Sequence, residues 1–559
     1  MRIKAVSLNH PAVFTFVVSS FIVGAYNLSF WRGFTRAIGG FQLGNIPLLL
    51  ATFVILALVF NVVITLVAFR PLIKPVLALL LCVTSLAAYF MDQYGTAIDV
   101  AMIQNVFETN SMEAFELISW RMLLVFLLFG VLPSVFVWRT RLEFLPLRQD
   151  LIVKLLVVAG SLVVAVMLLL FFYKSYAPTF RGHRELRFLL TPVNYIQATN
   201  SFFKRKFSHP LTVAPLGQDA VKGALWDGLS RRTVTVIVLG ETARAMNFSL
   251  NGYQRETNPQ LSKQTGLINF TNVQSCGTAT AVSVPCLFSA LGRDNYTETA
   301  AKSREGLLDV LSHAGFDVLW RNNNSGCKGA CDRVEYEDWS KPVAGDPLCT
   351  AEECYDERML KGLPDRIRAA KKDLVIVLHQ KGSHGPAYWK RYPDAFKRFG
   401  PICETNELQK CQSESIVAAY DNTILYTDHF VSKVIDLLRK AGSEGSIDTS
   451  LIYFSDHGES LGESGMYLHG APYMISPIEQ RHVPFMLWLS DSYRSRFRIE
   501  ASCLSARSNQ PFSHDNVFHS VLGMLNVSTT AYNPALDIFQ PCSQHSTPDR
   551  LRTPSGGRT

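Results

Sequence analysis

Two carboxylates and three histidines in the second half of the chain follow short apolar runs. Glu241 follows TVTVIVLG (233–240), Asp456 and His457 close SLIYFSD (450–456), His384 follows DLVIVLH (373–379), and His469 comes shortly afterwards in YLHG. Such runs predict buried parallel strands, whose carboxyl ends form a ligand-binding edge. Mixed oxygen and imidazole ligands suit zinc or manganese better than calcium. The set predicts a metal site, although each residue alone could be a helix cap or an ordinary histidine.

A hydroxyl nucleophile is predicted in the segment SCGTATAVSVPCLFSAL, which begins at Ser275 and changes from small polar to apolar residues. This change predicts the start of a helix, with Thr278 and Thr280 in or near its first turn. A helix N-terminus favours a phosphate group, and a hydroxyl there can bind a metal and attack phosphorus. Thr280 could instead only cap the helix; the metal candidates favour the nucleophile.

The elements that must position these residues form an α/β layered domain, expected over residues 231–542. A further strand is predicted at FDVLW (316–320), and helical spacing of apolar residues predicts a helix over 418–440. The tail 543–559 is polar and rich in Pro, Ser and Gly, which indicates disorder.

Ten of the 11 cysteines lie beyond residue 275, which favours disulfides and an oxidising compartment. Pairing of neighbours would close small loops. The alternative is a structural zinc site, which the spacings favour less because Cys-x2-Cys pairs are missing. The predicted pairs are Cys276–Cys286, Cys327–Cys331, Cys349–Cys354, Cys403–Cys411 and Cys503–Cys542.

Residues 1–173 contain five apolar stretches near the length of a membrane-spanning helix. They lie at about 11–31, 46–69, 75–91, 121–138 and 155–173. The first could be a cleavable signal peptide and the short third one a buried core helix, but four other apolar stretches accompany each. Lys and Arg residues flank the spans mainly on one side, with Arg32 and Arg36 of the 32–45 loop as exceptions, whereas the 92–120 loop carries five acids and no Lys or Arg. The positive-inside rule then places the N-terminus in the cytoplasm and everything after residue 174 outside.

The bridge over residues 174–230 interleaves basic residues with phenylalanines, which suits a helix in the headgroup region; a plain solvated linker is the alternative. The net charge of +8 suits an anionic membrane surface or an acidic substrate. The sequence has no Lys/Arg-rich arm, so we expect no nucleic-acid partner.

Five motifs in order, CGTAT…VPC, NNNSGCK, HQKGSHGPAYWKRYP, SDHGESLGE and YLHGAP, resemble the phosphoethanolamine transferases that modify lipid A. This family includes the colistin-resistance enzymes and belongs to the alkaline phosphatase superfamily. The resemblance spans nearly the whole chain. It implies a five-helix transmembrane domain followed by an α/β, alkaline-phosphatase-like (sulfatase-like) periplasmic domain with a mostly parallel central sheet.

The resemblance also implies roles for individual residues. Thr280 matches the family nucleophile, and Glu241, Asp456 and His457 match the ligands of its zinc, with Thr280 as the fourth. His384 and His469 match histidines near the phosphate and any second zinc. Residues around bound phosphoethanolamine are matched by Thr278, Asn324, Lys328 and Glu459, and positions linked to the lipid donor by Asn105 and Glu113. His514 and Asp515, in SHDNVFHSVLG, have no assigned role.

The implied function is transfer of phosphoethanolamine from phosphatidylethanolamine to a lipid A phosphate through phospho-Thr280, with His384 or His469 as the acid. This would confer resistance to cationic peptides such as polymyxin. We expect a monomer in the inner membrane of a Gram-negative bacterium. Rival interpretations are transfer to heptose or Kdo, a lipoteichoic acid synthase-like glycerophosphate transferase, a sulfatase or phosphatase, and a non-catalytic lipid sensor.

Overall fold

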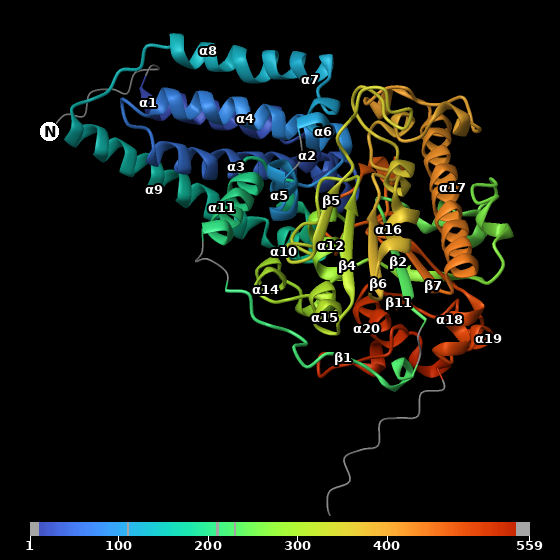
Figure 1. Ribbon diagram of the computed structural model, residues 1–559. Helices are drawn as coiled ribbons and strands as arrows, with labels where there is room; N and C mark the ends of the chain where they lie inside the picture. Colours follow the sequence, from blue (N-terminus) through green and yellow to red (C-terminus); the bar gives the residue numbers. More distant parts are fainter. Residues whose placement is uncertain (1–9, 109–110, 208–211, 229–230, 544–559) are drawn as a thin grey trace, which may run out of the picture. The chain divides into compact units, whose positions relative to one another are not determined.

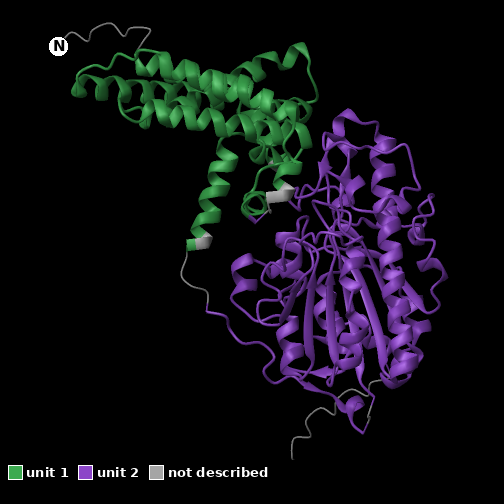
Figure 2. Cartoon of the chain, turned by 45° about the horizontal axis from the view of Figure 1, so that its top comes forward, with its two compact units in different colours: residues 1–107, 114–207 green, residues 108–113, 208–559 purple. Residues whose placement is uncertain are grey.

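The computed structural model describes residues 10–108, 111–207, 212–228 and 231–543 of the chain. The tail predicted to be disordered lies outside the described residues from 544 onward. Two compact units are present, and they are coloured separately in Figure 2. The first comprises residues 1–107 and 114–207, and the second comprises residues 108–113 and 208–559.

The first unit is helical. Four helical stretches in the described part of the chain are long and apolar enough to cross a membrane: Leu43–Leu66, Ile73–Tyr94, Trp120–Arg139 and Leu147–Phe171. Its α-helices are α1 (Pro11–Ala25), α2 (Leu28–Ala37), α3 (Ile46–Leu66), α4 (Ile73–Tyr94), α5 (Val100–Glu108), α6 (Ser111–Glu116), α7 (Trp120–Val125), α8 (Leu132–Arg139), α9 (Leu147–Phe171), α10 (Tyr173–Gly182) and α11 (Val193–Phe207). The end of α5 and the start of α6, residues 108–113, group with the second unit.

The first predicted span, 11–31, is bent in the structure. Helices α1 and α2 meet at 65°, and together they count as at most one further span. Asn27 lies in the break, where its side-chain amide donates to the carbonyls of Ile22 and Thr191, at 3.0 Å each. A polar side chain that binds backbone groups competes with the helical hydrogen bonds and so explains the bend.

Two other spans have features that the sequence did not predict. The stretch predicted at 121–138 contains a π-helical segment, Phe126–Val131, directly before Pro133. Proline lacks an N–H group and clashes with the preceding turn, which a wider turn relieves. Helix α9 begins eight residues before the predicted 155, because Asp150 and Lys154 pair at 2.8 Å along its first turns.

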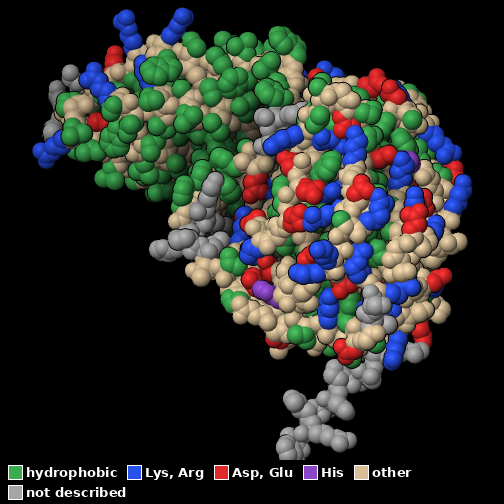
Figure 3. Space-filling model, viewed as in Figure 1, with side chains coloured by type: hydrophobic (Ala, Val, Ile, Leu, Met, Phe, Trp, Pro, Cys, Tyr) green, Lys and Arg blue, Asp and Glu red, His purple; other side chains and the backbone are tan. Residues whose placement is uncertain are grey.

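The aromatic residues of the predicted bridge divide between packing and exposure. Phe202 on α11 is buried and stacks on Phe107 of α5, with ring centroids 5.1 Å apart. Phe207 is 77% exposed. In Figure 3 hydrophobic side chains cover much of the visible surface of the helical unit, whereas charged side chains are interspersed over the second unit. A largely apolar exterior is what a membrane-embedded bundle requires.

The second unit is an α/β domain (Figure 1). Its strands are β1 (Val221–Lys222), β2 (Thr233–Gly240), β3 (Leu267–Gln274), β4 (Asp317–Asn322), β5 (Glu335–Asp338), β6 (Leu374–His379), β7 (Asp448–Ser455), β8 (Ser460–Leu461), β9 (Tyr467–Leu468), β10 (His482–Leu489), β11 (Phe512–Ser513) and β12 (Val527–Ser528). Its α-helices are α12 (Thr280–Leu287), α13 (Gly292–Asn295), α14 (Glu298–Lys302), α15 (Leu307–His313), α16 (Leu363–Ala369), α17 (Ser413–Gly445), α18 (Asp491–Arg496), α19 (Ala501–Ala506) and α20 (Asp515–Met524).

The central sheet has eight strands in the order β11-β3-β10-β7-β2-β6-β4-β5. Every neighbouring pair is parallel except the two pairs that include β10. The expectation of a mostly parallel central sheet is therefore confirmed.

The alternation of side chains along β2 divides the core between the two faces of the sheet. Val234, Val236 and Val238 belong to one apolar cluster, which also includes side chains of α16 and α17. Ile237 and Leu239 belong to the other, with side chains of α12, α15 and α20. Both faces of the sheet are thus covered, which explains why its central strands appear in the sequence as continuous apolar runs.

Ten cysteines of the second unit form five disulfides between sequence neighbours. The pairs are Cys276–Cys286, Cys327–Cys331, Cys349–Cys354, Cys403–Cys411 and Cys503–Cys542. The bond between Cys276 and Cys286 closes the loop that contains Thr280, so the start of α12 is constrained covalently.

Candidate active site

Two carboxylates emerge side by side from neighbouring parallel strands. Gly240 of β2 pairs with Ser455 of β7, so Glu241 and Asp456 are the next residues on adjacent strands. Thr242 then takes a left-handed conformation with φ of 52°, which turns the chain sharply. A residue with a branched side chain adopts this conformation only where its surroundings impose it. Here the backbone N–H of Thr242 donates to Asp456 at 3.2 Å, which ties the two strand ends together.

Thr280 is the first residue of α12, and its hydroxyl faces this pair of strand ends. Its Oγ1 lies 3.0 and 3.2 Å from the carboxylate oxygens of Glu241 and 3.3 Å from Nε2 of His457. All of these side chains are buried. The structure therefore brings together the four predicted metal ligands, and it places the hydroxyl at a helix N-terminus as the sequence predicted.

The atoms of this cluster leave room for a cation to bind. One oxygen each from Glu241 and Asp456 and one ring nitrogen of His457 lie within 4.8 Å of one another. Oδ1 of Asp456 accepts the His457 N–H at 2.7 Å, but Oδ2 is buried and has no hydrogen-bond partner among the described residues. Nδ1 of His457 lies 2.9 Å from the carbonyl of Gly458, which leaves Nε2 to face the cluster. This carboxylate oxygen of Asp456 lies 3.4 Å from Nε2 of His457, and the two atoms together suit a metal ion such as zinc.

Electrostatics also indicate that this cluster needs positive charge. Burial and the neighbouring charge of Glu241 raise the pKa of Asp456 to about 8. Burial alone would lower the pKa of His457, but the charges of Asp456 and Glu241 raise it to about 9. Burial alone would raise the pKa of Glu241, yet the hydrogen bond with His457 and the positive charge of that ring hold this pKa well below the usual range. A bound divalent metal ion would offset the negative charge of both buried carboxylates.

Glu241 is supported from behind by Asn324 and by the loop after β6. The amide of Asn324 donates to Oε2 of Glu241 at 2.6 Å and to the carbonyl of Gln380 at 2.9 Å. Gly382 has φ of 55°, and a Cβ atom at this position would lie 2.6 Å from the Glu241 carbonyl oxygen. A glycine is therefore required at 382. Asn324 was predicted to contact the substrate; in the structure its amide positions a metal-ligand candidate.

His469 lies between two other histidine rings, those of His457 in the cluster and of His384. The ring centroids of His457 and His469 are 4.4 Å apart, and those of His469 and His384 are 5.5 Å apart. Nδ1 of His469 lies 2.7 Å from Oε2 of Glu459. The other oxygen of Glu459 accepts a hydrogen bond from Tyr388 at 2.6 Å. This chain of contacts fixes the orientation of His469 and leaves its Nε2 available for proton transfer.

Thr278 and Lys328 contact backbone carbonyls in the described part of the second unit. The hydroxyl of Thr278 donates to the carbonyl of Ala471 at 2.6 Å, and Nζ of Lys328 donates to the carbonyl of Ser325 at 3.2 Å. Asn105 lies on α5 in the first unit. Glu113 lies in α6, and its side chain is outside the described part of the structure.

His514 links the segment before α12 to the end of β7. Its Nδ1 accepts the backbone N–H of Cys276 at 3.2 Å, and its Nε2 lies 3.0 Å from the carbonyl of Ser455. Burial lowers the pKa of His514 to about 3, so the ring is neutral near pH 7 and can both accept and donate. Oδ1 of Asp515 accepts the backbone N–H of Arg293 at 2.8 Å. The sequence pointed to His514 and Asp515 but gave neither residue a role.

Sequence reasoning also missed Tyr388, the partner of Glu459. The sequence did contain a signal for this residue, because Tyr388 lies within the motif HQKGSHGPAYWKRYP, four residues after His384. A tyrosine is more often a core residue, and only the fold shows that its hydroxyl faces a buried carboxylate.

Comparison with known proteins covers both units. The family model described as phosphoethanolamine transferase EptA/EptB matches residues 56–207, and the sulfatase model matches residues 233–527. Phosphoethanolamine transferase EptA of Escherichia coli is 41% identical over 548 residues, which cover 97% of this chain and 99% of that protein. Phosphatidylethanolamine transferase Mcr-1 of Escherichia coli is 39% identical over 489 residues, which cover 86% of this chain and 89% of that protein.

A solved structure extends this likeness to three dimensions. The integral membrane protein lipooligosaccharide phosphoethanolamine transferase A (EptA) from Neisseria meningitidis matches with a TM-score of 0.90 and 33% identity. The match covers 95% of this chain and 98% of that one.

Proposed function

Because the chain belongs to the phosphoethanolamine transferase family, we propose that it transfers phosphoethanolamine from phosphatidylethanolamine to a phosphate of lipid A, with Thr280 as the covalent carrier. One observation carries the proposal. Oγ1 of Thr280 lies 3.0 Å from Glu241, at a helix N-terminus and within a buried carboxylate and imidazole cluster. A hydroxyl so placed has the surroundings of a nucleophile and not those of a simple helix cap.

Zinc fits the donor set of the cluster. Glu241, Asp456, His457 and Thr280 are the residues that would hold it, and the resemblance to the family allows a second ion near His384 and His469. When bound, zinc supplies positive charge that lowers the pKa of the Thr280 hydroxyl and polarises a phosphoryl oxygen. The orphaned oxygen of Asp456 supports this assignment.

In the first half-reaction Thr280 gives up its hydroxyl proton to solvent, and its Oγ1 forms a bond to the phosphorus of phosphatidylethanolamine. The bond between phosphorus and the diacylglycerol oxygen breaks. The leaving oxygen takes a proton, and His469 is the candidate donor because Glu459 holds its Nδ1 and leaves Nε2 available; His384 is the alternative. Diacylglycerol departs and phosphoethanolamine remains on Thr280.

In the second half-reaction a phosphate oxygen of lipid A attacks the same phosphorus. The bond to Oγ1 of Thr280 breaks, and Oγ1 takes up a proton from solvent, which restores the hydroxyl. The positive N-terminus of α12 and the ammonium group of Lys328 would offset the negative charge on the phosphoryl group. The ammonium group added to lipid A reduces its net negative charge, which weakens binding of cationic peptides such as polymyxin.

Both substrates are lipids, so the catalytic unit must work at a membrane surface. The long apolar helices of the first unit support an inner-membrane location, and the five disulfides support a catalytic unit in the periplasm. A lipoteichoic acid synthase-like enzyme shares the five-helix plan, but the cysteine-rich domain and HQKGSHGP favour phosphoethanolamine transfer.

The direct test is reconstitution. Purified full-length protein is incubated with phosphatidylethanolamine and lipid A, and the lipid A is then analysed by mass spectrometry. We expect one added phosphoethanolamine on a lipid A phosphate, and no addition with Thr280→Ala. Addition to a Kdo or heptose sugar would instead assign the acceptor of a relative such as the Kdo(2)-lipid A phosphoethanolamine 7''-transferase of Escherichia coli, which is 26% identical. Release of free phosphoethanolamine without lipid A modification would indicate a hydrolase.

A further inference from the structure

Asp356 is a buried carboxylate that the proposed chemistry does not use. It follows the loop closed by the Cys349–Cys354 disulfide and is 3% exposed. Its two oxygens accept four hydrogen bonds. They come from Lys381 N at 2.7 Å, Asn323 Nδ2 at 2.8 Å, Gly382 N at 3.1 Å and Gln380 Nε2 at 3.2 Å.

These four donors belong to the two segments that flank Glu241. Asn323 immediately precedes Asn324, whose amide donates to Oε2 of Glu241. On the other side, Gly382 packs against the Glu241 carbonyl oxygen, and Ser383 N donates to that oxygen at 3.0 Å. A single carboxylate thus holds together the end of β4 and the loop after β6.

The chemistry of the four contacts requires a carboxylate at this position. Every partner is an N–H donor, and an ionised aspartate is the short side chain that offers acceptors only. Burial raises the pKa of Asp356, whereas the hydrogen bonds from Asn323, Lys381 and Gly382 oppose that rise. An asparagine would turn an NH2 group toward N–H donors, so the same shape would lose contacts and gain repulsion.

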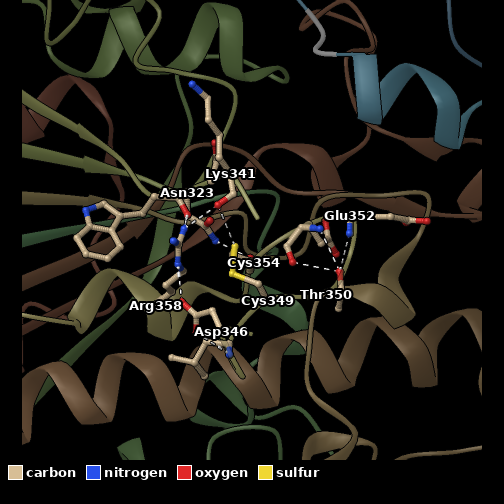
Figure 4. The surroundings of a disulfide bond; sticks show 12 residues. Asn323, Lys341, Asp346, Cys349, Thr350, Glu352, Cys354 and Arg358 are labelled. Carbon is tan, nitrogen blue, oxygen red and sulfur yellow. Dashed lines mark hydrogen bonds and ion pairs between the residues drawn. A yellow bond between two sulfur atoms is a disulfide. The ribbon is translucent and has the colours of Figure 1, made fainter. Parts of the chain in front are cut away.

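The loop closed by Cys349 and Cys354 belongs to the same network. Figure 4 shows Asn323 beside this disulfide, and its amide donates to the carbonyl of Cys354 at 3.0 Å. Arg358 follows this loop and Asp346 precedes it, and Nε of Arg358 donates to Oδ2 of Asp346 at 3.0 Å. The disulfide therefore fixes a segment that contacts Asn323 directly and leads into Asp356.

We propose that Asp356 is a positioning residue for the transfer reaction, which through Asn323 and the 380–382 loop sets the placement of Glu241. The inference rests on the proposed function. Asp356 does not touch the cluster; it acts through Asn324 on one side and through Gly382 on the other. The Cys349–Cys354 loop contributes to the same placement.

The test compares Asp356→Asn with wild-type full-length protein, with Asp365→Asn on the surface of α16 as the matched control. We expect kcat for phosphatidylethanolamine cleavage to fall about tenfold or more, with KM within about twofold. Hydrogen exchange should accelerate at the amides of Lys381 and Gly382 and stay at the wild-type rate in β7. Asp365→Asn should change neither readout.

A double-mutant cycle tests the contribution of the disulfide. Replacing Cys349 and Cys354 by serine should lower kcat, and adding Asp356→Asn should lower it by less than the product of the separate effects. In the same cycle with serines at Cys503 and Cys542, the separate effects of the serine replacements and of Asp356→Asn on kcat should multiply.

Two results would overturn the inference. In the first, Asp356→Asn has the same kcat and the same hydrogen-exchange rates as wild type. In the second, exchange in Asp356→Asn accelerates equally throughout the second unit. A wild-type protein without lipid turnover would contradict the proposed function. In that case the exchange pattern at Lys381 and Gly382 alone decides whether Asp356 positions these loops.

Discussion

Oγ1 of Thr280 and Oε1 of Glu241 lie 3.0 Å apart although 39 positions separate the two residues in the sequence. The contact forms because Glu241 directly follows β2 and Thr280 begins α12 at the same edge of the sheet. Asp456 and His457 reach this point from β7, the strand beside β2. The geometry makes several quantitative expectations possible.

Glu241→Gln should remove bound zinc. The neutral amide leaves Asp456 and His457 without the second carboxylate that their buried site requires. Elemental analysis of purified protein should give about one zinc per wild-type chain and much less in the variant. Glu357→Gln, which changes an acid paired with Lys433 outside the cluster, is the control and should retain zinc. Equal zinc in Glu241→Gln and wild type would contradict the assignment.

Asn324→Ala should weaken zinc binding without removing a ligand. Its amide donates to Oε2 of Glu241 at 2.6 Å, and residues that orient metal ligands typically contribute about 10- to 100-fold in metal affinity. Competition with a chelator of known affinity measures the change. Asn295→Ala, at an exposed position on α13, should leave the affinity unchanged. The expectation is wrong if the two alanine variants bind zinc equally well.

Tyr388→Phe should lower kcat about tenfold at an unchanged donor KM, because Glu459 loses a charged hydrogen bond of 2.6 Å and holds His469 less firmly. Steady-state kinetics with a phosphatidylethanolamine analogue separates the two parameters. Tyr253→Phe removes the same kind of bond, to Asp421 at 2.9 Å, away from the cluster and serves as the control. A rise in KM alone would assign Tyr388 to substrate binding instead.

His514→Asn should flatten the acid side of the stability profile. The unfolded histidine binds a proton below about pH 6.5, whereas burial lowers the pKa of folded His514 to about 3. Between these values the unfolded state binds more protons, so stability is fully present above pH 6.5 and falls as the pH decreases. The loss amounts to about 2 kcal/mol from pH 6.5 to 5.

Thermal unfolding of the detergent-solubilised protein over this pH range measures the profile. His514→Asn should show a smaller decrease in melting temperature on acidification, and His313→Asn on the surface should follow wild type. Parallel profiles for His514→Asn and wild type would show that this histidine does not titrate as expected.

Part of the fold could be predicted from local sequence pattern alone. β2, β6 and β7 are buried on both faces, so their Val, Ile and Leu runs were visible in the sequence. β10 was not predicted, because Pro484 interrupts it; the structure accommodates the proline with a register shift between Val483 and Phe485. β3 was missed because its intermediate and exposed positions carry polar residues such as Asn269 and Thr271.

Less of the site was visible in the sequence. Strand ends identify Glu241, Asp456 and His457, because chain direction alone brings them to one edge of the sheet. Asp356 and His514 act through contacts with residues distant in sequence, and nothing in their local pattern distinguishes them from ordinary polar residues. The bend at Asn27 was missed for the same reason, since its partner Thr191 is 164 positions away.

The central claim is that Thr280 carries phosphoethanolamine between two lipids. The most direct measurement is mass spectrometry of peptides from full-length protein incubated with phosphatidylethanolamine in the absence of lipid A. The account predicts one phosphoethanolamine on Thr280, its loss when lipid A is added, and no adduct in Thr280→Ala. Lipid A modification by a protein whose Thr280 never acquires this group, or full activity of Thr280→Ala, would contradict the account.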